Sequence, residues 1–259
     1  GTTREQRLII KSILMATERG LGHGETPIFP VQVFKVKEGV NFYPGDPNYD
    51  LFELSVKVSA KRLFPNWEFL DAPFNLKFYK KGDPDTEVAT MGCRTRVMAN
   101  RHGASTTSGR GNLSFTSINL PRLAIEAHGD VRKFMQSLRE IAEIVTEQLY
   151  SRFELQGKIK VKDLPFLFGQ NLYMGSEKLG PDDEIRPALM HGTLGIGFVG
   201  LAEALVALTG HHHGESEAAQ KLGLEIVGEL ALQAKKASEI YDFNFSLIGS
   251  PAASTAGAF

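Results

Sequence analysis

The sequence predicts an α/β domain with a largely parallel sheet. Predicted strands alternate with predicted helices along the chain, which is the order that parallel βαβ units require. Glycine supplies 26 of 259 residues, above the usual share of about 7%, and suits the many tight turns of such a fold. Apolar residues make up 42% and charged residues 23%, a composition that excludes an intrinsically disordered chain.

The first part of the chain contains two predicted helices. Apolar residues at helical spacing predict a helix over 2–18, and a second over 49–63 that Pro65 ends. Alternating and β-branched residues predict a strand over 29–36. Two more strands are expected over 74–79 and 87–91, on either side of a turn rich in Gly, Asp and Pro.

The second part begins with a polar stretch over 99–111. The predicted elements that follow are strand 113–120, helix 130–153, a buried apolar helix over 192–208, helix 215–241 and strand 243–248. The sequence shows no internal repeat and no domain boundary. We therefore expect a single α/β unit over 1–259.

Charge and cysteine content limit the function classes. The 29 Lys and Arg nearly balance the 30 Asp and Glu, which gives no reason to expect nucleic acid or an anionic membrane as a partner. No stretch of 18 apolar residues predicts a membrane span. Cys93 is the single cysteine, so an internal disulfide and a multi-cysteine zinc site are excluded, and a reducing, cytoplasmic location is expected. The adjacent residues His211–His213 point in different directions, so no metal site is expected there.

Cys93 lies in the segment Met91-Gly-Cys-Arg-Thr95, between a predicted strand and the polar stretch. One interpretation is a small buried hydrophobic residue. The other is a reactive thiol, whose pKa Arg94 and Arg96 would lower. The residues alone leave both interpretations open.

Two further segments are candidates for ligand binding. Gly109 and Gly111 would let the backbone approach a ligand, and Arg110 and Asn112 offer hydrogen-bond donors, although Gly-Arg-Gly is also common in plain turns. The segment 250–257 follows a predicted strand and is rich in small residues. Its backbone amides are typical of an anion site, and a frayed chain end is the alternative.

Five motifs, in this order, resemble the anaerobic (class III) ribonucleoside-triphosphate reductases. The motifs are Thr26-Pro-Ile-Phe-Pro, Gly45-Asp-Pro-Asn-Tyr-Asp-Leu-Phe-Glu-Leu, Met91-Gly-Cys-Arg-Thr, Gly109-Arg-Gly-Asn with Asn119-Leu-Pro-Arg-Leu, and Gly195-Ile-Gly-Phe-Val-Gly-Leu-Ala-Glu-Ala. The resemblance runs from about residue 25 to the end. It implies a ten-stranded α/β barrel of the glycyl-radical and ribonucleotide reductase type. This chain would form part of that barrel, with a central finger loop at about 88–112.

The resemblance also implies roles for individual residues. Cys93 would form a thiyl radical that abstracts the 3′ hydrogen of a ribonucleotide and starts the loss of its 2′ hydroxyl as water. Thr95 would contact the ribose and Asn112 the substrate, with Asn119 as a second candidate and Arg110 as a further donor. The segment with Ser250, Ala253, Ser254, Thr255 and Ala256 resembles a loop that holds substrate phosphates. Its sequence is nearer to the Pro-x-Ala-Ser-Thr form of the aerobic classes than to the Pro-Ala-Glu form of class III.

For the whole enzyme, the resemblance implies a glycyl radical, a structural zinc and ATP or dNTP effectors. Its partners would be formate or a thiol reductant, a radical-SAM activating enzyme and a second copy in a homodimer. We expect this chain to be a fragment that lacks the glycyl-radical and zinc region, binds none of these cofactors and does not turn over alone. The alternatives are another glycyl-radical enzyme, such as a pyruvate formate-lyase relative, and a non-catalytic nucleotide-binding module derived from a reductase.

Overall fold

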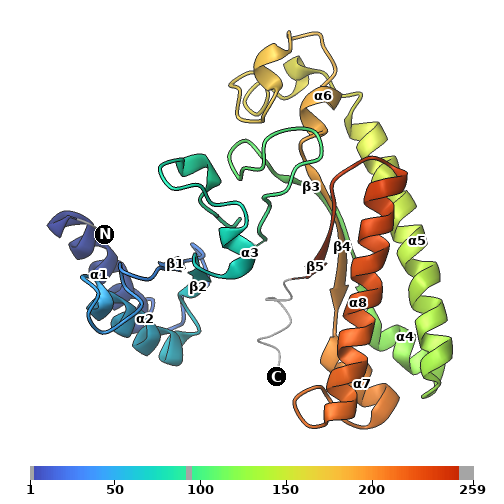
Figure 1. The fold of residues 1–259 in the computed structure, drawn as a ribbon, viewed down its shortest axis with the longest axis horizontal. Helices are drawn as coiled ribbons and strands as arrows, with labels where there is room; N and C mark the ends of the chain where they lie inside the picture. The colour runs from blue at the N-terminus through green and yellow to red at the C-terminus, as the bar shows by residue number, and fades with distance from the viewer. Residues whose placement is uncertain (1–2, 92–94, 251–259) are drawn as a thin grey trace. The chain divides into compact units, whose positions relative to one another are not determined.

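A computed structural model describes residues 3–91 and 95–250. Contacts between Cα atoms divide the chain into two compact units, Gly1–Arg96 and Val97–Phe259. Figure 1 traces the elements of both units in chain order. Cys93, Ala253, Ser254, Thr255 and Ala256 lie outside the described residues.

Unit 1 contains helix α1 (Arg4–Arg19), strand β1 (Val33–Val36), helix α2 (Tyr49–Arg62) and strand β2 (Asn66–Phe69). The two strands pair in parallel, with Val33 opposite Asn66, because α2 carries the chain back to the start of the sheet. Thr3 begins α1 with a capping box to Gln6, which satisfies two of the amides that a helix start leaves free.

The rest of unit 1 has little regular structure. Helix α3 (Pro73–Leu76) and the 3₁₀ turn η1 (Pro84–Thr86) follow β2. Thr90 and Arg96 form an isolated antiparallel bridge, and the Met91 amide donates to the Thr95 carbonyl at 3.0 Å. The described residues on either side of 92–94 therefore lie next to each other.

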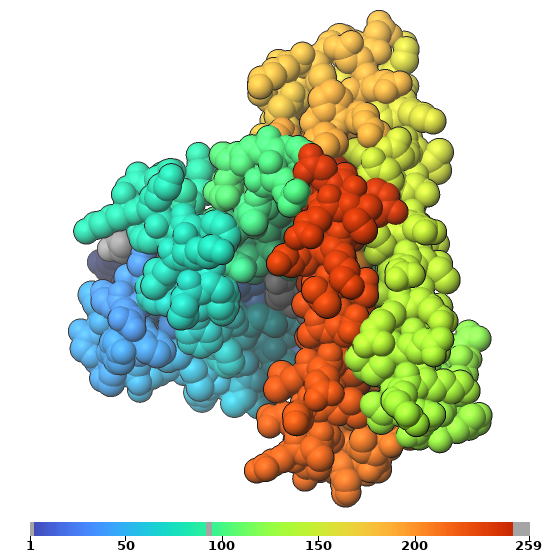
Figure 2. Space-filling model, turned by 45° about the vertical axis from the view of Figure 1, so that its right-hand side comes forward, coloured from blue at the N-terminus to red at the C-terminus, as the bar shows by residue number. Residues whose placement is uncertain are grey.

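Unit 2 is built on a three-stranded parallel sheet in the order β3-β4-β5. Its strands are β3 (Asn112–Asn119), β4 (Thr193–Val199) and β5 (Phe245–Gly249). Helix α5 (Val131–Gln156) lies in the connection from β3 to β4, and helix α8 (Glu217–Ile240) joins β4 to β5. The two long helices lie side by side in the space-filling view (Figure 2).

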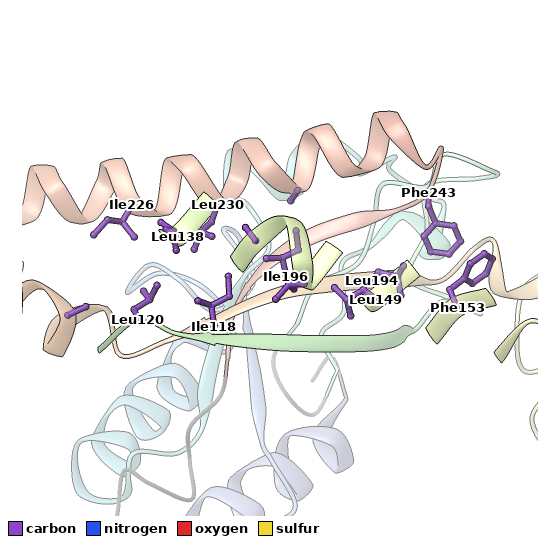
Figure 3. Packing of buried hydrophobic residues seen from close by; sticks show 14 of the residues in the cluster. Ile118, Leu120, Leu138, Leu149, Phe153, Leu194, Ile196, Ile226, Leu230 and Phe243 are labelled. Carbon is purple, nitrogen blue, oxygen red and sulfur yellow. The ribbon is translucent and has the colours of Figure 1, made fainter. Parts of the chain in front are cut away.

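The core of unit 2 lies between this helix pair and one face of the sheet. Ile118, Leu194 and Ile196 point toward α5 and α8, where they meet Leu138, Leu149, Ile226 and Leu230 (Figure 3). Phe153 and Phe243 close one end of the core, with ring centroids 4.4 Å apart. Burial of these side chains removes a large apolar area from water and holds the sheet rigidly against the helices.

Short elements complete unit 2. Helix α4 (Leu120–Ala127) follows β3, and helix α7 (Leu201–Thr209) follows β4. The connection between α5 and β4 contains η2 (Val161–Asp163), η3 (Ser176–Lys178) and helix α6 (Arg186–Leu189). In the described parts of the chain, no helix is long and apolar enough to cross a membrane.

The predicted parallel α/β architecture is confirmed, and three predicted elements are wrong. Residues 74–79 form α3 and turns rather than a strand, because Pro73 fixes a helical first turn. Residues 87–91 form no named strand and contribute only the bridge at Thr90. The predicted helix 192–208 is instead strand β4 followed by α7, since Gly200 has φ 77° and separates the two. An apolar stretch of this length does not by itself distinguish a strand from a buried helix.

Candidate functional site

The candidate site is the face of the β3-β4-β5 sheet opposite α5 and α8, which we call the distal face. Successive side chains of a strand point to opposite faces, and Ile118, Leu194 and Ile196 occupy the helix side. The alternate positions therefore form the distal face. They are Phe115, Ser117, Asn119, Thr193, Gly195, Gly197, Val199, Ser246, Ile248 and Ser250.

Two glycines of β4 let the side chains of the neighbouring strands cover the centre of the distal face. A Cβ at Gly195 would lie 3.0 Å from Cβ of Phe115, and a Cβ at Gly197 would lie 2.5 Å from Oγ of Ser250. Side chains of β3 and β5 thus close over the bare β4 backbone from both sides. The hydroxyls of Ser117 and Ser250 form a hydrogen bond there. A residue larger than glycine at 197 would separate these hydroxyls.

Ser117, Asn119 and Ser250 lie toward the carboxyl end of the sheet, where ligands of open parallel sheets usually bind. The Ser250 amide donates to the Phe198 carbonyl at 2.9 Å, which continues the β5 pairing by one residue. The Asn119 side chain accepts from the Arg122 amide at 3.0 Å and caps α4. Its amide oxygen is therefore engaged in starting a helix, which is a structural role at this edge.

Asn112 begins β3 and pairs with Thr193 at the start of β4, and the register of the two strands shifts between Asn112 and Ser114. The Oδ1 atom of Asn112 and the Oγ1 atom of Thr193 are both buried, and neither has a hydrogen-bond partner. Buried polar atoms of folded proteins nearly always have a partner. The amino ends of β3 and β4 therefore carry two polar atoms whose hydrogen-bonding capacity the described residues leave unused.

Arg110 binds the backbone of the polar stretch rather than open space. Its guanidinium donates to the carbonyls of Met98 at 3.2 Å, Ala99 at 3.1 Å and Thr106 at 3.4 Å, and to that of His191. Burial lowers the pKa of Arg110 from its usual value. The residue folds the loop 98–106 against the start of β4, so these donors are already engaged.

Two asparagines complete the attachment of this loop. Asn244, just before β5, accepts from the Arg101 amide at 2.9 Å and donates to the Gly192 carbonyl at 3.0 Å. Asn100 lies 3.2 Å from Nδ1 of His191. Burial, and then the charge of Arg110, lower the pKa of His191, so the folded loop favours the neutral imidazole.

Unit 1 contains a second set of unpartnered polar atoms. Trp67 donates to Ser55 of α2 at 3.0 Å, so the alternate residues Asn66 and Glu68 point away from that helix. Nδ2 of Asn66 and both carboxylate oxygens of Glu68 are buried and have no hydrogen-bond partner. Burial raises the pKa of Glu68 against the opposing influence of Lys35.

Unit 1 also contains a cavity of about 390 Å³ among α1, β1 and α2. Its lining is mostly aliphatic, and Asn41 and Asn48 in its wall already bond to backbone groups and to Arg7. The described residues contain no group of three His, Cys, Asp or Glu side chains that could hold a metal ion.

Comparison with known proteins agrees with this architecture. The family model described as anaerobic ribonucleoside-triphosphate reductase matches residues 1–259. The chain belongs to this family. It is 32% identical over 257 residues to the anaerobic ribonucleoside-triphosphate reductase of Escherichia coli K12, and 32% identical over 261 residues to that of Enterobacteria phage T4. These alignments cover 97% of this chain but 35% and 40% of the two relatives, so the chain spans little more than a third of their length.

Solved structures of anaerobic ribonucleotide reductase share the fold. The Thermotoga maritima enzyme with citrate in its active site superposes with a TM-score of 0.60 at 18% identity, covering 95% of this chain and 39% of that one. The same enzyme in complex with dATP and CTP gives a TM-score of 0.59, with 93% and 35% covered. The resemblance found in the sequence motifs is thus confirmed at the level of the family, whose curated members are named as reductases.

The predicted site residues lie at different places in the described structure. Asn119 and Ser250 lie toward the carboxyl edge of the sheet and Asn112 at the amino end of β3, whereas Arg110 binds the adjacent loop and Thr95 lies in unit 1. The sequence analysis missed Thr193, Ser117 and the strand conformation of Gly195 and Gly197. The alternation of glycine in Gly195-Ile-Gly197 was the available signal, because a period of two is typical of a strand.

Proposed function

We propose that this chain binds a ribonucleoside triphosphate on its distal face, as part of an anaerobic ribonucleoside-triphosphate reductase that reduces the substrate to the deoxyribonucleotide. Family membership over the whole chain supports the reaction. Buried polar atoms without a hydrogen-bond partner at the amino ends of β3 and β4 support the location. The unpartnered oxygens of Asn112 and Thr193 are the single observation that carries the choice of this sheet.

The proposal keeps the roles in nucleotide binding that the resemblance implies for these residues. Ser250 and the segment with Ala253, Ser254, Thr255 and Ala256 would hold the phosphates through backbone amides at the carboxyl edge. Asn112 would contact the sugar. Arg110 would position the loop beside it, because its donors bind backbone carbonyls, and Asn119 would maintain the edge by capping α4.

In the whole protein, the described units would belong to a ten-stranded barrel whose finger loop spans about 88–112. Cys93 would carry the thiyl radical that abstracts the 3′ hydrogen, and Thr95 would accompany it at the sugar. The backbone bond between Met91 and Thr95 supports a reversal of the chain at this place. One-electron chemistry at sulfur requires a positioned thiol protected from water.

The other components of the proposal follow from the family and from no residue described in this chain. They are a glycyl radical, effector binding of ATP or dNTP, a radical-SAM activating enzyme, formate or a thiol as reductant, a homodimer and a cytoplasmic location. A structural zinc is part of the same set. The described residues do not fit it, since they gather no group of metal-binding side chains.

The test is nucleotide binding by this chain, measured by isothermal titration with a ribonucleoside triphosphate. Asn112→Ala is expected to weaken binding by about 1–3 kcal/mol, because a desolvated amide contact to the ligand is lost. Asn171→Ala, in the connection between α5 and β4, is the matched control and should bind like the parent chain. Absence of nucleotide binding by the parent chain, or equal affinity of Asn112→Ala, would contradict the proposal.

A further inference from the structure

The imidazole of His191, just before β4, is a contact point for the polar loop 98–106. Nδ2 of Asn100 in that loop lies 3.2 Å from Nδ1 of His191. The ring also lies close to two glycines. A Cβ at Gly103 would be 3.1 Å from Cε1 of the ring, and a Cβ at Gly175 would be 3.4 Å from Nε2. The bare backbone at Gly103 thus lets the loop pack directly against the imidazole.

The orientation of the Asn100 amide is fixed by its other hydrogen bonds. Its Oδ1 atom accepts from the backbone amide of His102 at 3.1 Å and from Nδ2 of Asn244 at 3.3 Å. Its Nδ2 group donates to the Ala104 carbonyl at 3.3 Å. A flipped amide would break these three bonds, and an amide nitrogen can only donate. The contact between Asn100 and His191 therefore requires Nδ1 of the ring to carry no proton.

Protonation of His191 would turn this contact from an attraction into a repulsion. A charged imidazole carries a hydrogen on both ring nitrogens, so Nδ1 would present a donor to the donor of Asn100. The amide could not turn round to accept, because its oxygen is held by His102 and Asn244. The loop would then have to move away from the ring.

The surroundings of the ring act in the same direction. Burial has the largest influence and lowers the pKa of His191. The charged groups around the ring are Arg110, His102 and Lys178, which oppose an imidazolium, and Glu177, which favours it. Three positive groups against one carboxylate leave a charged His191 without compensation in the closed loop.

We propose that Asn100 and His191 form a pH-sensitive latch, which holds loop 98–106 against the start of β4 while the imidazole is neutral and releases it when the imidazole is protonated. The latch is a property of the fold and does not depend on nucleotide binding. The loop leads along the chain to Asn112, so its release changes the conformation next to the proposed nucleotide site.

The sign of the pH dependence follows from linkage. The closed loop lowers the pKa of His191 from its usual value of about 6.5, so the open loop binds the proton more tightly. Closure is therefore complete above about pH 6.5. It is lost progressively as the pH falls from there through the lower pKa of the closed form.

Hydrogen exchange of the amides in 98–106, measured on this chain between about pH 5 and 8, tests the latch. Protection factors are compared, because they remove the intrinsic pH dependence of amide exchange and report the opening of the loop. One proton changes an equilibrium by at most about tenfold per pH unit. Protection should therefore fall about 3- to 10-fold between pH 7.5 and 5.5 in the parent chain. His191→Gln should remove this fall.

Asn100→Asp should reverse the sign. A carboxylate keeps an acceptor for the His102 amide and for Asn244, and its second oxygen accepts from Nδ1 of a protonated His191. Protection of the loop should then rise as the pH falls. A residue that only filled space at position 100 would not produce this reversal. A fall as large as that of the parent chain, in Asn100→Asp or in His191→Gln, would overturn the latch.

His102→Gln is the matched control, since it removes the other histidine at this loop. Nε2 of His102 bonds to the Asp242 carbonyl at 2.8 Å, so the variant should keep the fall in protection at acid pH, and loss of the fall would assign the switch to His102 instead. If Asn100→Asp did not fold, Gly103→Ala carries the test. Its Cβ would lie 3.0 Å from Nδ2 of Asn100, so protection should be low at every pH, and a step like that of the parent chain would overturn the proposal.

Discussion

Unit 2 buries its large apolar side chains more completely than unit 1 does. Unit 2 covers one sheet face with two long helices and buries Phe134, Phe153 and Phe243 completely. Unit 1 has strands of only four residues, and Phe29 and Phe74 remain 78% and 60% exposed. A short strand offers few inward positions, so a two-stranded sheet buries little apolar surface. Unit 2 therefore has the larger core of its own.

The units agree in where they leave polar atoms unsatisfied. In unit 1 the unpartnered atoms of Asn66 and Glu68 lie on the sheet face away from α2. In unit 2 that of Thr193 lies on the face away from α5 and α8. Helices thus cover the apolar face of each sheet, and the opposite face carries the polar chemistry.

The largest expected effect tests the difference between the two cores. Phe153→Ala should lower the free energy of unfolding of unit 2 by about 3–5 kcal/mol, because it opens a cavity in a fully packed site. Phe74→Ala in unit 1 should cost less than about 1 kcal/mol, since mainly its contact with Arg96 is lost. Urea unfolding measures both changes. Trp67 is the single tryptophan, so its fluorescence follows unit 1 while circular dichroism follows the helices of unit 2.

The next effect concerns Gly197 on the distal face, where the Ser117 and Ser250 side chains meet. Gly197→Ala should destabilise unit 2 by about 1–3 kcal/mol, because the new methyl group would overlap the hydroxyls of Ser117 and Ser250. Gly228→Ala is the control, since a Cβ at that position in α8 meets no atom within 4 Å. That variant should gain about 0.5–1 kcal/mol. Equal stabilities of the two variants in thermal unfolding would contradict the close packing of Ser117 and Ser250 over Gly197.

A smaller effect is expected at the loop beside the site. Arg110→Gln should lower stability by about 2 kcal/mol, because several charge-assisted bonds to backbone carbonyls are lost. Hydrogen exchange of the amides in 98–106 should accelerate selectively. Arg139→Gln, which removes only an ion pair to Glu229 across the surface of α5 and α8, should change stability by about 0.5 kcal/mol or less. Unchanged exchange in Arg110→Gln would show that the loop is held by other contacts.

The smallest effect is a pH dependence of opposite sign in the two units. Burial raises the pKa of Glu68, with Lys35 and Arg96 opposing it, so the folded state holds its proton longer and unit 1 should lose stability as the pH rises above about 4.5. Burial and then Arg110 lower the pKa of His191. The unfolded chain therefore binds that proton first, and unit 2 should lose stability as the pH falls below about 6.5.

Two substitutions check these signs. Glu68→Gln should flatten the pH dependence that Trp67 fluorescence reports, and His191→Gln should flatten the one that circular dichroism reports. Urea unfolding at a series of pH values between 4 and 8 measures both. A slope that persists in either variant would assign the proton to another group.

The sequence predicted the long helices well because their signals are local. Asp130 caps α5 by accepting from the Arg132 and Lys133 amides, and Ser216 caps α8 in the same way. The family was also found from short motifs, whose order along the chain is a property of the sequence. The strands were predicted less well, since the four-residue β2 was missed and β4 was expected to be helical.

In the candidate site, too, local motifs were predicted from the sequence and contacts between strands were not. Asn112 and Ser250 were selected from their motifs, and the structure places Asn112 at the start of β3 and Ser250 beside Ser117 near its end. The alternation of Gly195 and Gly197 fits a helix or a strand until the neighbours on β3 and β5 are known. Arg110 illustrates a different failure, since its sequence context suggested a free donor and the fold directs it to backbone carbonyls.

The sequence by itself determined the family of this protein, its parallel α/β class and the helices that local capping and periodicity specify. Only the tertiary structure decided that Thr193 lies opposite Asn112 and that both oxygens are buried without partners. The physical reason is distance along the chain. Helix signals act over a few residues, whereas strand register and burial arise from segments that meet only after the helices between them have packed.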